Sequence, residues 1–581
     1  MHDILTREVT PTKNILWKLE PDDLPEPYCF VNIQNALRLE NGNTIICSRG
    51  MNGKPTMKKV QSAFLLFCLG MMSPIAGAQP PSGNTSILGD SGRAKPEILT
   101  PPTPRVPAIH GPKIFGVRPG SAVLFSIPAT GDRPMSFSAH GLPHGLKLDR
   151  LTGLLTGKLK RPGSYKTKLY AHNHLATTER DFTIRVGDDI CLTPPMGWNS
   201  YNVWGANIDS ERLLSAAKAM VESGLSQHGF TYINIDDGWQ GTRGGKLHAV
   251  QPDAMAFPDF PQTTQQIHAL GLKIGIYHTP WVTSYGRRVG ASSEKPDGAW
   301  DKSLSDGPRN RKILPYAIGK YHFMKQDAQQ FAEWNVDYLK YDWAPVEAPE
   351  TKEMEAALRS TGRDIVFSLS NNATNSLLNV IGEVRPHANL WRTNHDIDDS
   401  WKTVVRNGFD QDAWAPFQGP GHFNDPDMLV VGVVGWGKPH PTRLTPDEQY
   451  THVSLWCLLS APLILGNNLE QLDDFTKSLL TNDEVLDVDQ DSLGKQATMV
   501  REEGETRVYA KPLADGSWAV GLFNLGSEAT NLTMSWVDLG IRGKQTVRDL
   551  WSQTDLGSYD DQFASPVAAH GVRLVRIIRS K

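Results

Sequence analysis

The stretch VDYLKYDW, residues 336–343, decides how this sequence is interpreted. It follows a helical pattern, is rich in aromatic and branched side chains and stops before Pro345, which together predict a short β-strand. Side chains alternate between the two faces of a strand, so Lys340 and Asp342 point in the same direction. Burying a cation and a carboxylate on one face is costly unless the charges are paired or bind a ligand. This strand is therefore a candidate for part of a functional site.

Seven further segments between residues 190 and 490 repeat the pattern of an apolar strand alternating with an amphipathic helix. They are PPMGWNSY, TYINIDD, LKIGIYH, DIVFSLS, NLWRTN, the segment around FNDPDML, and PLILGNN. The helix after the first strand has Asp209 or Ser210 as its expected N-cap. Eight such strands favour a (β/α)8 barrel, the TIM-barrel fold. An open doubly wound sheet is the alternative, and the lack of a glycine-rich dinucleotide motif after the first strand disfavours it.

Two β-rich regions flank the expected barrel at residues 189–489, so the chain is predicted to be multidomain. Short alternating strands over residues 111–188 predict an immunoglobulin-like (Ig-like) β-sandwich, and GLPHGLKLDRLTGLLTG within it resembles modules found beside bacterial carbohydrate-active domains. Residues 490–581 lose helical periodicity and predict a C-terminal antiparallel β-sandwich. Proline, glycine and serine enrichment predicts an extended linker over residues 79–110.

The segment at residues 57–78 has the form of a secretory signal peptide: two lysines, a short apolar run and the small residues Ala76-Gly77-Ala78. A transmembrane anchor is one alternative, but the apolar run is too short to span a bilayer. A lipoprotein with its anchor at Cys68 is the other, and the bulky Phe67 before this cysteine disfavours it. We therefore expect a secreted or periplasmic protein with no membrane association after the leader is removed. An internal leader also predicts that translation starts at Met57 and that residues 1–56 are an over-extended reading frame.

The charge balance and the cysteine content argue against nucleic acid as a partner and against a framework of disulfide bonds. The chain has 59 basic and 63 acidic residues, a formal net charge of −4 and no basic block, which argues against nucleic acid as a partner. Without the leader, Cys191 and Cys457 remain, so no disulfide framework supports the fold, although one bridge stays possible.

Charged residues gather where the expected barrel strands end, which is where barrel enzymes place their catalytic groups. They are Asp236, Asp237, Lys340, Asp342, Arg392, Asp396 and Asp427. Each alone could be a structural ion pair or a helix cap, but together they suit a polyhydroxylated ligand. Aromatic side chains could stack on a sugar ring there, with ordinary barrel packing as the alternative for at least half of them. These aromatic candidates are Trp198, Tyr201, Trp239, Tyr277 and Trp281.

A metal site is the rival interpretation of the acidic segments DIDD, residues 396–399, and NDPD, residues 424–427. Neither segment has the spacing of a calcium-binding loop, and no histidine pair lies on one strand. We therefore predict neither a catalytic metal nor a cofactor.

In their order along the chain, these motifs resemble glycoside hydrolase family 27, the α-galactosidase or melibiase family. The resemblance covers residues 190–581 and is carried by PPMGWNSYNVW, YINIDDGW, LKIGIY, YLKYDW, WRTNHDIDDSW, NDPDML and APLILGNN. It implies a retaining exo-glycosidase that removes terminal α-linked galactose. In this chemistry one aspartate attacks the anomeric carbon, and a second protonates the leaving oxygen and then activates water. Motif matching makes Asp342 the nucleophile and Asp396 the acid/base.

The same resemblance implies how the sugar is held. Asp236 and Asp237 would bind the 4-OH and the 6-OH end of galactose, and Arg392 and Asp427 would bind other hydroxyls. Lys340 is expected to lower the pKa of the Asp342 carboxyl, keep it ionised for attack, and donate to sugar hydroxyls. Tyr201 and Tyr277 complete the expected sugar-binding set.

Some positions differ from the better-known eukaryotic members of that family. Tyr201 replaces a tryptophan, and Ser284 and Ala344 lie near the positions of a pocket disulfide, so rigidity beside the nucleophile is expected to come from packing.

Ser370 and Ala373 have the spacing that the family's N-acetylgalactosaminidases use to admit an acetamide. An ordinary galactose pocket with a different shape is the alternative. The rival functions are thus α-N-acetylgalactosaminidase, β-L-arabinopyranosidase and, from another class, a non-catalytic carbohydrate-binding protein.

Overall fold

The computed structural model describes residues 37–38, 44–49, 55–60, 96–300, 316–370 and 374–580, and the chain forms two compact units, residues 1–93 and 94–581. In the first unit, β1 (Leu37–Arg38), β2 (Thr44–Arg49) and β3 (Pro55–Val60) form an antiparallel sheet. Of the expected leader, only residues 57–60 are among the described residues, where they end β3. The signal peptide and the start at Met57 therefore remain predictions.

The second unit contains the predicted barrel. Its parallel strands are β13 (Met196–Asn199), β14 (Tyr232–Asn234), β17 (Lys273–His278), β20 (Tyr338–Asp342), β21 (Val366–Ser370), β22 (Leu390–Arg392), β23 (Phe423–Asp425) and β26 (Leu463–Leu465). They pair in the order β23-β22-β21-β20-β17-β14-β13-β26. A parallel bridge between Leu429, beyond β23, and Leu465 of β26 joins the two ends of the sheet. All eight predicted strands are therefore confirmed, and the barrel is correct rather than the open sheet.

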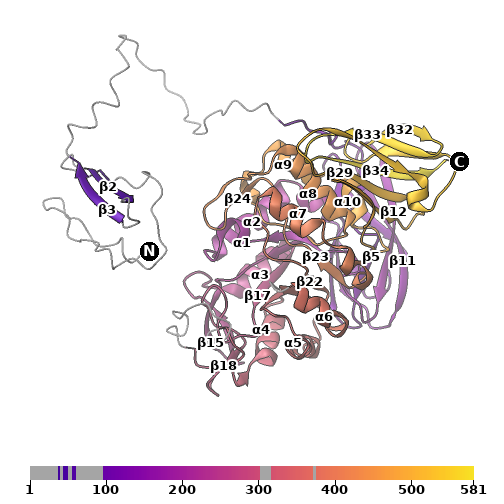
Figure 1. The fold of residues 1–581 in the computed structure, drawn as a ribbon. Helices are drawn as coiled ribbons and strands as arrows, with labels where there is room; N and C mark the ends of the chain where they lie inside the picture. The colour runs from indigo at the N-terminus through magenta and orange to yellow at the C-terminus, as the bar shows by residue number, and fades with distance from the viewer. Residues whose placement is uncertain are drawn as a thin grey trace, which may run out of the picture. The chain divides into compact units, whose positions relative to one another are not determined.

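Helices alternate with these strands along the chain (Figure 1). They are α1 (Tyr201–Trp204), α2 (Ser210–Glu222), α3 (Phe260–Ala269), α4 (Met324–Glu333), α5 (Ala348–Ser360), α6 (Thr374–Val384), α7 (Trp401–Gly408), α8 (Pro446–Leu458), α9 (Asp474–Leu480) and α10 (Asp483–Asp489). The N-cap of α2 is Asp209, whose side chain accepts a hydrogen bond from the Arg212 amide at 2.9 Å. Among the helices that the structure describes, none has the length and apolarity to cross a bilayer.

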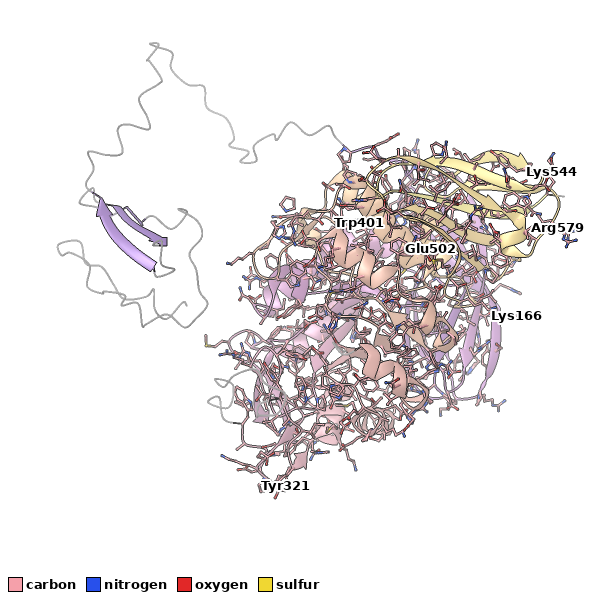
Figure 2. All side chains as sticks on the ribbon, in the orientation of Figure 1. Lys166, Tyr321, Trp401, Glu502, Lys544 and Arg579 are labelled. Carbon is pink, nitrogen blue, oxygen red and sulfur yellow. The ribbon has the colours of Figure 1, made fainter. Side chains whose placement is uncertain are left out.

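The C-terminal domain is the predicted β-sandwich. Its sheets have the orders β27-β28-β29-β34-β31-β32 and β30-β33. The strands are β27 (Thr498–Glu503), β28 (Thr506–Pro512), β29 (Trp518–Asn524), β30 (Thr530–Ser535), β31 (Gln545–Asp549), β32 (Thr554–Tyr559), β33 (Gln562–Val567) and β34 (Val572–Arg579). Helix α8 contacts β29 and β34 of this domain and also the barrel helices α7, α9 and α10, which explains why most of its residues are buried (Figure 1). Trp401, at the start of α7 and labelled in Figure 2, stacks on His570 of this domain, and the ring centres are 4.6 Å apart.

The Ig-like domain is also confirmed, with its own apolar core. Its sheets have the orders β6-β10-β9, β5-β12-β11-β8 and β4-β7. The strands are β4 (Ala108–Ile109), β5 (Ile114–Val117), β6 (Ala122–Ser126), β7 (Ala129–Thr130), β8 (Ser136–His140), β9 (Leu146–Leu148), β10 (Leu154–Lys158), β11 (Gly163–His172) and β12 (Thr177–Val186).

The described part of the expected linker, residues 96–110, is not a free spacer. Its end forms β4, which pairs with β7 of the Ig-like domain. The Leu99 amide donates to the Tyr450 hydroxyl at 3.0 Å, and the Thr100 hydroxyl donates to the Ser478 carbonyl at 2.8 Å. Proline-rich composition predicted an extended chain, but it did not reveal that helices α8 and α9 offer that chain hydrogen-bond partners.

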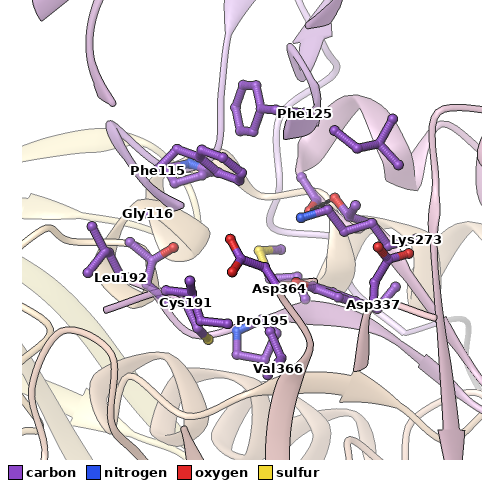
Figure 3. Close-up of a pocket in the computed structure, with 18 of the residues that line it drawn as sticks. Phe115, Gly116, Phe125, Cys191, Leu192, Pro195, Lys273, Asp337, Asp364 and Val366 are labelled. Carbon is purple, nitrogen blue, oxygen red and sulfur yellow. Dashed lines mark hydrogen bonds between the residues drawn. The ribbon is translucent and has the colours of Figure 1, made fainter. Parts of the chain in front are cut away.

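The Ig-like domain packs against the N-terminal ends of the barrel strands, and a pocket lies at this junction (Figure 3). Lys273, the first residue of β17, extends into it, with Nζ 5.2 Å from the ring centre of Phe115 and 5.3 Å from that of Tyr232. Cys191 lines the same pocket, whereas Cys457 is buried in α8. Both cysteines are free thiols, so the bridge that the sequence left open is not formed.

Candidate active site

The charged residues singled out in the sequence meet at the C-terminal ends of the barrel strands. Asp236 follows β14 and is the centre of one group: its Oδ2 accepts hydrogen bonds from Lys340 Nζ at 2.7 Å and from Asn199 Nδ2 at 2.8 Å. Lys340 lies on β20, so this ion pair spans the intervening strand β17. The Lys340 side chain is 15% exposed and Asp236 is almost fully buried, so the pair is largely shielded from solvent.

Asp342 is the last residue of β20 and is 8% exposed. The Tyr277 hydroxyl donates to its Oδ2 at 3.0 Å. Burial raises the pKa of Asp342 to about 7, while Lys340 lowers this pKa and Asp396 raises it through their charges. The expectation that Lys340 keeps Asp342 ionised is therefore only half right. Lys340 acts in the expected direction, but it hydrogen-bonds Asp236 instead, and burial outweighs its effect on Asp342.

A second group surrounds Arg392, the last residue of β22. Its Nη2 lies 3.1 Å from Asp396 Oδ1 and 2.8 Å from Asp427 Oδ2. The Ile397 amide also donates to Asp427 Oδ2, at 2.8 Å, and burial raises the pKa of Asp427. Asp427 has φ of 89°, a conformation uncommon outside glycine, and the Asp425 side chain accepts its amide at 2.8 Å. This backbone turn presents the Asp427 carboxylate to Arg392.

The two candidate catalytic carboxyls differ sharply in exposure. The Asp396 side chain is 69% exposed, whereas Asp342 is 8% exposed. Asp396 is nevertheless close enough for its charge to raise the pKa of Asp342. The site thus has one carboxyl at its floor and one at its rim.

Asp237 is held by groups that the sequence did not single out as partners. The Ser284 hydroxyl donates to its Oδ1 at 2.7 Å, and the Gly286 amide donates to its Oδ2 at 2.5 Å. Burial raises the pKa of Asp237 to about 6, and both donors lower it. Tyr201, at the start of α1, is close enough that the charges of Asp236, Asp237 and Asp396 raise its pKa, after burial.

Rigidity near the proposed nucleophile was expected to come from packing, but hydrogen bonds also contribute to it. Ser284, near one position of the missing disulfide, is hydrogen-bonded to Asp237 and accepts the Arg288 amide at 3.1 Å. Asn199 and Gly286 were also missed as partners of the two aspartates. The available signal was the polar run Asn199-Ser200 at the end of the first barrel strand.

The remaining candidates separate into residues at the site and residues of the core. Ser370 ends β21, pairs with Asp342 across the sheet and is buried. Ala373 lies outside the described residues, so its predicted contribution stays a prediction. Trp239 is fully buried against Phe260 and Trp334, as the packing alternative has it.

The other two tryptophans are buried as well. Trp198 donates to the Asn467 carbonyl at 2.7 Å, and Trp281 packs against Tyr285 and Tyr316.

The acidic segments considered for a metal are engaged with protein groups. Asp399 accepts the Arg443 amide at 2.8 Å, and Asp398 accepts the Ser400 amide at 3.0 Å. Among the described residues, neither segment belongs to a cluster with the separations that a metal ion requires.

Comparison with known families matches each part of this architecture. The model described as "Alpha galactosidase A" matches residues 193–290 and 311–491, and "Alpha galactosidase C-terminal beta sandwich domain" matches residues 503–577. A model described as "Putative Ig domain" matches residues 106–187.

Individual relatives agree with the family models. "Alpha-galactosidase 2" of Arabidopsis thaliana is 34% identical over 68% of this chain and 92% of its own length. A Bacteroides fragilis crystal structure described as a "putative alpha-galactosidase" shares 30% identity and a TM-score of 0.72 over 84% of this chain and 99% of that one. A β-L-arabinopyranosidase from Geobacillus stearothermophilus shares 27% identity and a TM-score of 0.57 over 67% of this chain and 97% of that one. The chain therefore belongs to the α-galactosidases of glycoside hydrolase family 27 and is a glycosidase of α-galactosides.

Proposed function

We propose that this protein is a retaining exo-α-galactosidase that uses Asp342 as nucleophile and Asp396 as acid/base. In the first step an oxygen of Asp342 forms a bond to the anomeric carbon while the bond to the leaving oxygen breaks, and that oxygen takes the proton of Asp396. In the second step Asp396 removes a proton from water. The water oxygen then bonds to the anomeric carbon and releases Asp342.

The contrast between the two carboxyls is the observation that supports these roles. Asp396 is 69% exposed at the rim, where it can exchange protons with solvent between the two steps. Asp342 is 8% exposed, below it, and its position at the end of β20 is the one that a bound sugar would cover. Burial of the nucleophile also excludes competing water during attack.

Electrostatics alone would favour the opposite assignment, because a pKa of about 7 suits a proton donor better than a nucleophile. We favour Asp342 as nucleophile because its neighbours can still hold the anion. The Tyr277 hydroxyl donates to it at 3.0 Å, and Lys340 lowers its pKa. Asp342 then reacts from the fraction that is ionised, and this fraction increases with pH.

The other groups are proposed to hold the sugar. Asp236, with Lys340, would accept the axial 4-OH, and Asp237 would accept the hydroxymethyl end. Arg392 and Asp427 would bind further hydroxyls beside Asp396. Ser370, which lies next to Asp342 in the sheet, is proposed to face the 2-position, and Tyr201 and Tyr277 complete the proposed sugar-binding set.

We also propose that the protein acts outside the cytoplasm, because residues 57–78 have the form of a leader. Its proposed substrates are oligosaccharides or plant polysaccharides. Expression of the gene from Met57 in a host with a secretion pathway tests this proposal. Activity in the medium or periplasm, with an N-terminus beyond residue 78, supports it, and an uncleaved product in the cytoplasm contradicts it.

A panel of nitrophenyl α-galactoside, α-N-acetylgalactosaminide and β-L-arabinopyranoside tests the substrate assignment. The proposal predicts the highest kcat/KM on the α-galactoside. A preference for the acetamido sugar would show that Ser370 and its neighbours admit an acetamide. A preference for the arabinopyranoside would show that the hydroxymethyl group is not recognised through Asp237. Turnover that requires a catalytic metal, shown by loss of activity in a chelator, would contradict the two-aspartate mechanism.

A further inference from the structure

Three side chains of types that bind metals meet outside the candidate active site, and they come from separate segments of the chain. His110 follows β4 of the Ig-like domain, His228 ends the short helix η4 (Leu225–His228) of the barrel, and Asp483 begins α10. Their ligand atoms all lie within 4.8 Å of one another. His228 Nδ1 is 2.8 Å and His110 Nδ1 is 3.1 Å from the same oxygen, Asp483 Oδ1. Two imidazoles thus aim the same ring nitrogen at one carboxylate.

The site is constructed so that His110 is held in place. Arg180 of β12 donates to the carbonyls on both sides of it, to Ile109 and, at 2.6 Å, to Gly111. His110 Nε2 lies 2.7 Å from the Thr130 hydroxyl. A histidine that binds a metal through one nitrogen commonly donates its other N–H to an oxygen acceptor, and Thr130 provides that acceptor.

Both histidine side chains are largely shielded from solvent, and the aspartate is partly open to it. His110 and His228 are 13% and 6% exposed at their side chains, and their rings stack with centres 5.4 Å apart. Imidazole nitrogens and carboxylate oxygens are ligands that zinc prefers. Asp483 is 24% exposed, which leaves a path for an ion to enter.

We propose that His110, His228 and Asp483 bind a late first-row divalent cation, with Zn²⁺ as the first choice, through the two Nδ1 atoms and Asp483 Oδ1. Ligand atoms around tetrahedral zinc lie roughly 3.3 Å apart, given bonds of about 2.0–2.1 Å. The observed separations of 2.8 and 3.1 Å need only a small expansion to admit the ion. Water would complete the coordination on the exposed side of Asp483.

The consequence is structural rather than catalytic. The three ligands belong to the Ig-like domain, to the barrel and to the last barrel helix, so one ion would join all three. Without an ion, the same atoms form two hydrogen bonds to one carboxylate oxygen. The metal-free protein therefore folds as well, and the ion adds stability by binding the folded state only.

Titration of the tag-free full-length chain with Zn²⁺, after EDTA treatment and dialysis, tests the proposal. Isothermal titration calorimetry is expected to show one saturable site and differential scanning calorimetry a Tm that increases with Zn²⁺. Co²⁺ in place of Zn²⁺ is expected to give the intense visible absorption of a four-coordinate ion. Activity on a galactoside should not change, so the result does not depend on the proposed function.

Two ligand variants and a matched control locate the site. Asp483→Asn keeps an oxygen that accepts the two ring N–H groups, and His228→Gln keeps a polar side chain. Each should weaken Zn²⁺ binding by at least about tenfold to a hundredfold. His144→Gln, an exposed histidine of the same Ig-like domain, should bind as the natural chain does. No saturable binding by the natural chain, or equal binding by all four proteins, would overturn the proposal.

Discussion

Lys340 and Asp236 form an ion pair, with Nζ 2.7 Å from Oδ2, that spans strand β17 and joins the second and fourth strands of the barrel. Burial opposes the charge on Lys340, but Asp236 and Asp342 outweigh burial and raise its pKa above the ordinary value. The lysine therefore stays protonated at working pH. It fixes Asp236, a proposed sugar-binding residue, and its charge partly offsets the effect of burial on the pKa of the proposed nucleophile.

Lys340→Met should destabilise the protein, because it leaves Asp236 buried without its cation. The expected loss is about 3–5 kcal/mol in the free energy of unfolding at neutral pH, measured by urea denaturation. The double variant Lys340→Met/Asp236→Asn should recover much of it, because the unpaired charge is removed. Equal stability of the single and double variants would show that the ion pair is not what holds the two strands.

Lys340→Met should also move the pH dependence of kcat/KM. Lys340 lowers the pKa of Asp342, so its removal raises that pKa further above about 7. Because the nucleophile must be ionised, the pH at which kcat/KM is half-maximal on the acid side should increase. Tyr277→Phe removes the 3.0 Å donor and should shift the profile in the same direction. A shift toward lower pH in either variant would contradict the electrostatic account.

Ser284→Ala removes the donor 2.7 Å from Asp237 and should loosen that carboxylate. If Asp237 binds the hydroxymethyl end of galactose, kcat/KM should fall about tenfold on nitrophenyl α-galactoside, as expected for a lost hydrogen bond to a charged group. The β-L-arabinopyranoside has no hydroxymethyl group, so its turnover should change little. An equal loss on both substrates would assign Ser284 a structural role only.

The pKa of Asp342 also predicts a dependence of stability on pH. This carboxyl titrates at about 7 when folded and near 3.8 when unfolded. The unfolded state therefore releases its proton first. The contribution of Asp342 to the free energy of unfolding is most favourable below about pH 4 and becomes less favourable as pH rises towards 7. Asp342→Asn removes this penalty, so its Tm should exceed that of the natural chain at pH 8 and the difference should disappear near pH 4. A constant difference across this range would mean that Asp342 is not the titrating group.

Asp396→Asn should separate the two chemical steps. Without the acid, kcat/KM on an unactivated galacto-oligosaccharide should fall by about 10²–10⁴-fold. Glycosylation from nitrophenyl α-galactoside, whose leaving group needs no protonation, should be affected far less. Comparable losses on both substrates would argue against a proton-donating role for Asp396.

Much of this fold could be predicted from sequence because local patterns carry it. The eight barrel strands and both flanking sandwiches follow from apolar periodicity and turn residues, and the family motifs locate Asp342 and Asp396. Side-chain partnerships between distant segments could not be predicted in this way. Ser284 reaches Asp237 from 47 positions away, and Thr100 reaches Ser478 from 378 positions away. The state of Asp342 was also missed, because burial depends on the whole barrel mouth and not on the adjacent Lys340.

The configuration of the product formed by Asp342→Gly in the presence of azide tests the central claim most directly. Without its nucleophile the variant should be almost inactive, and its kcat on nitrophenyl α-galactoside should fall by about a thousandfold or more. Azide can occupy the space of the lost carboxylate and attack the anomeric carbon from the face opposite the leaving group. The account predicts that azide restores turnover and that the product is β-galactosyl azide. An α-galactosyl azide, or undiminished hydrolysis without azide, would contradict Asp342 as the nucleophile.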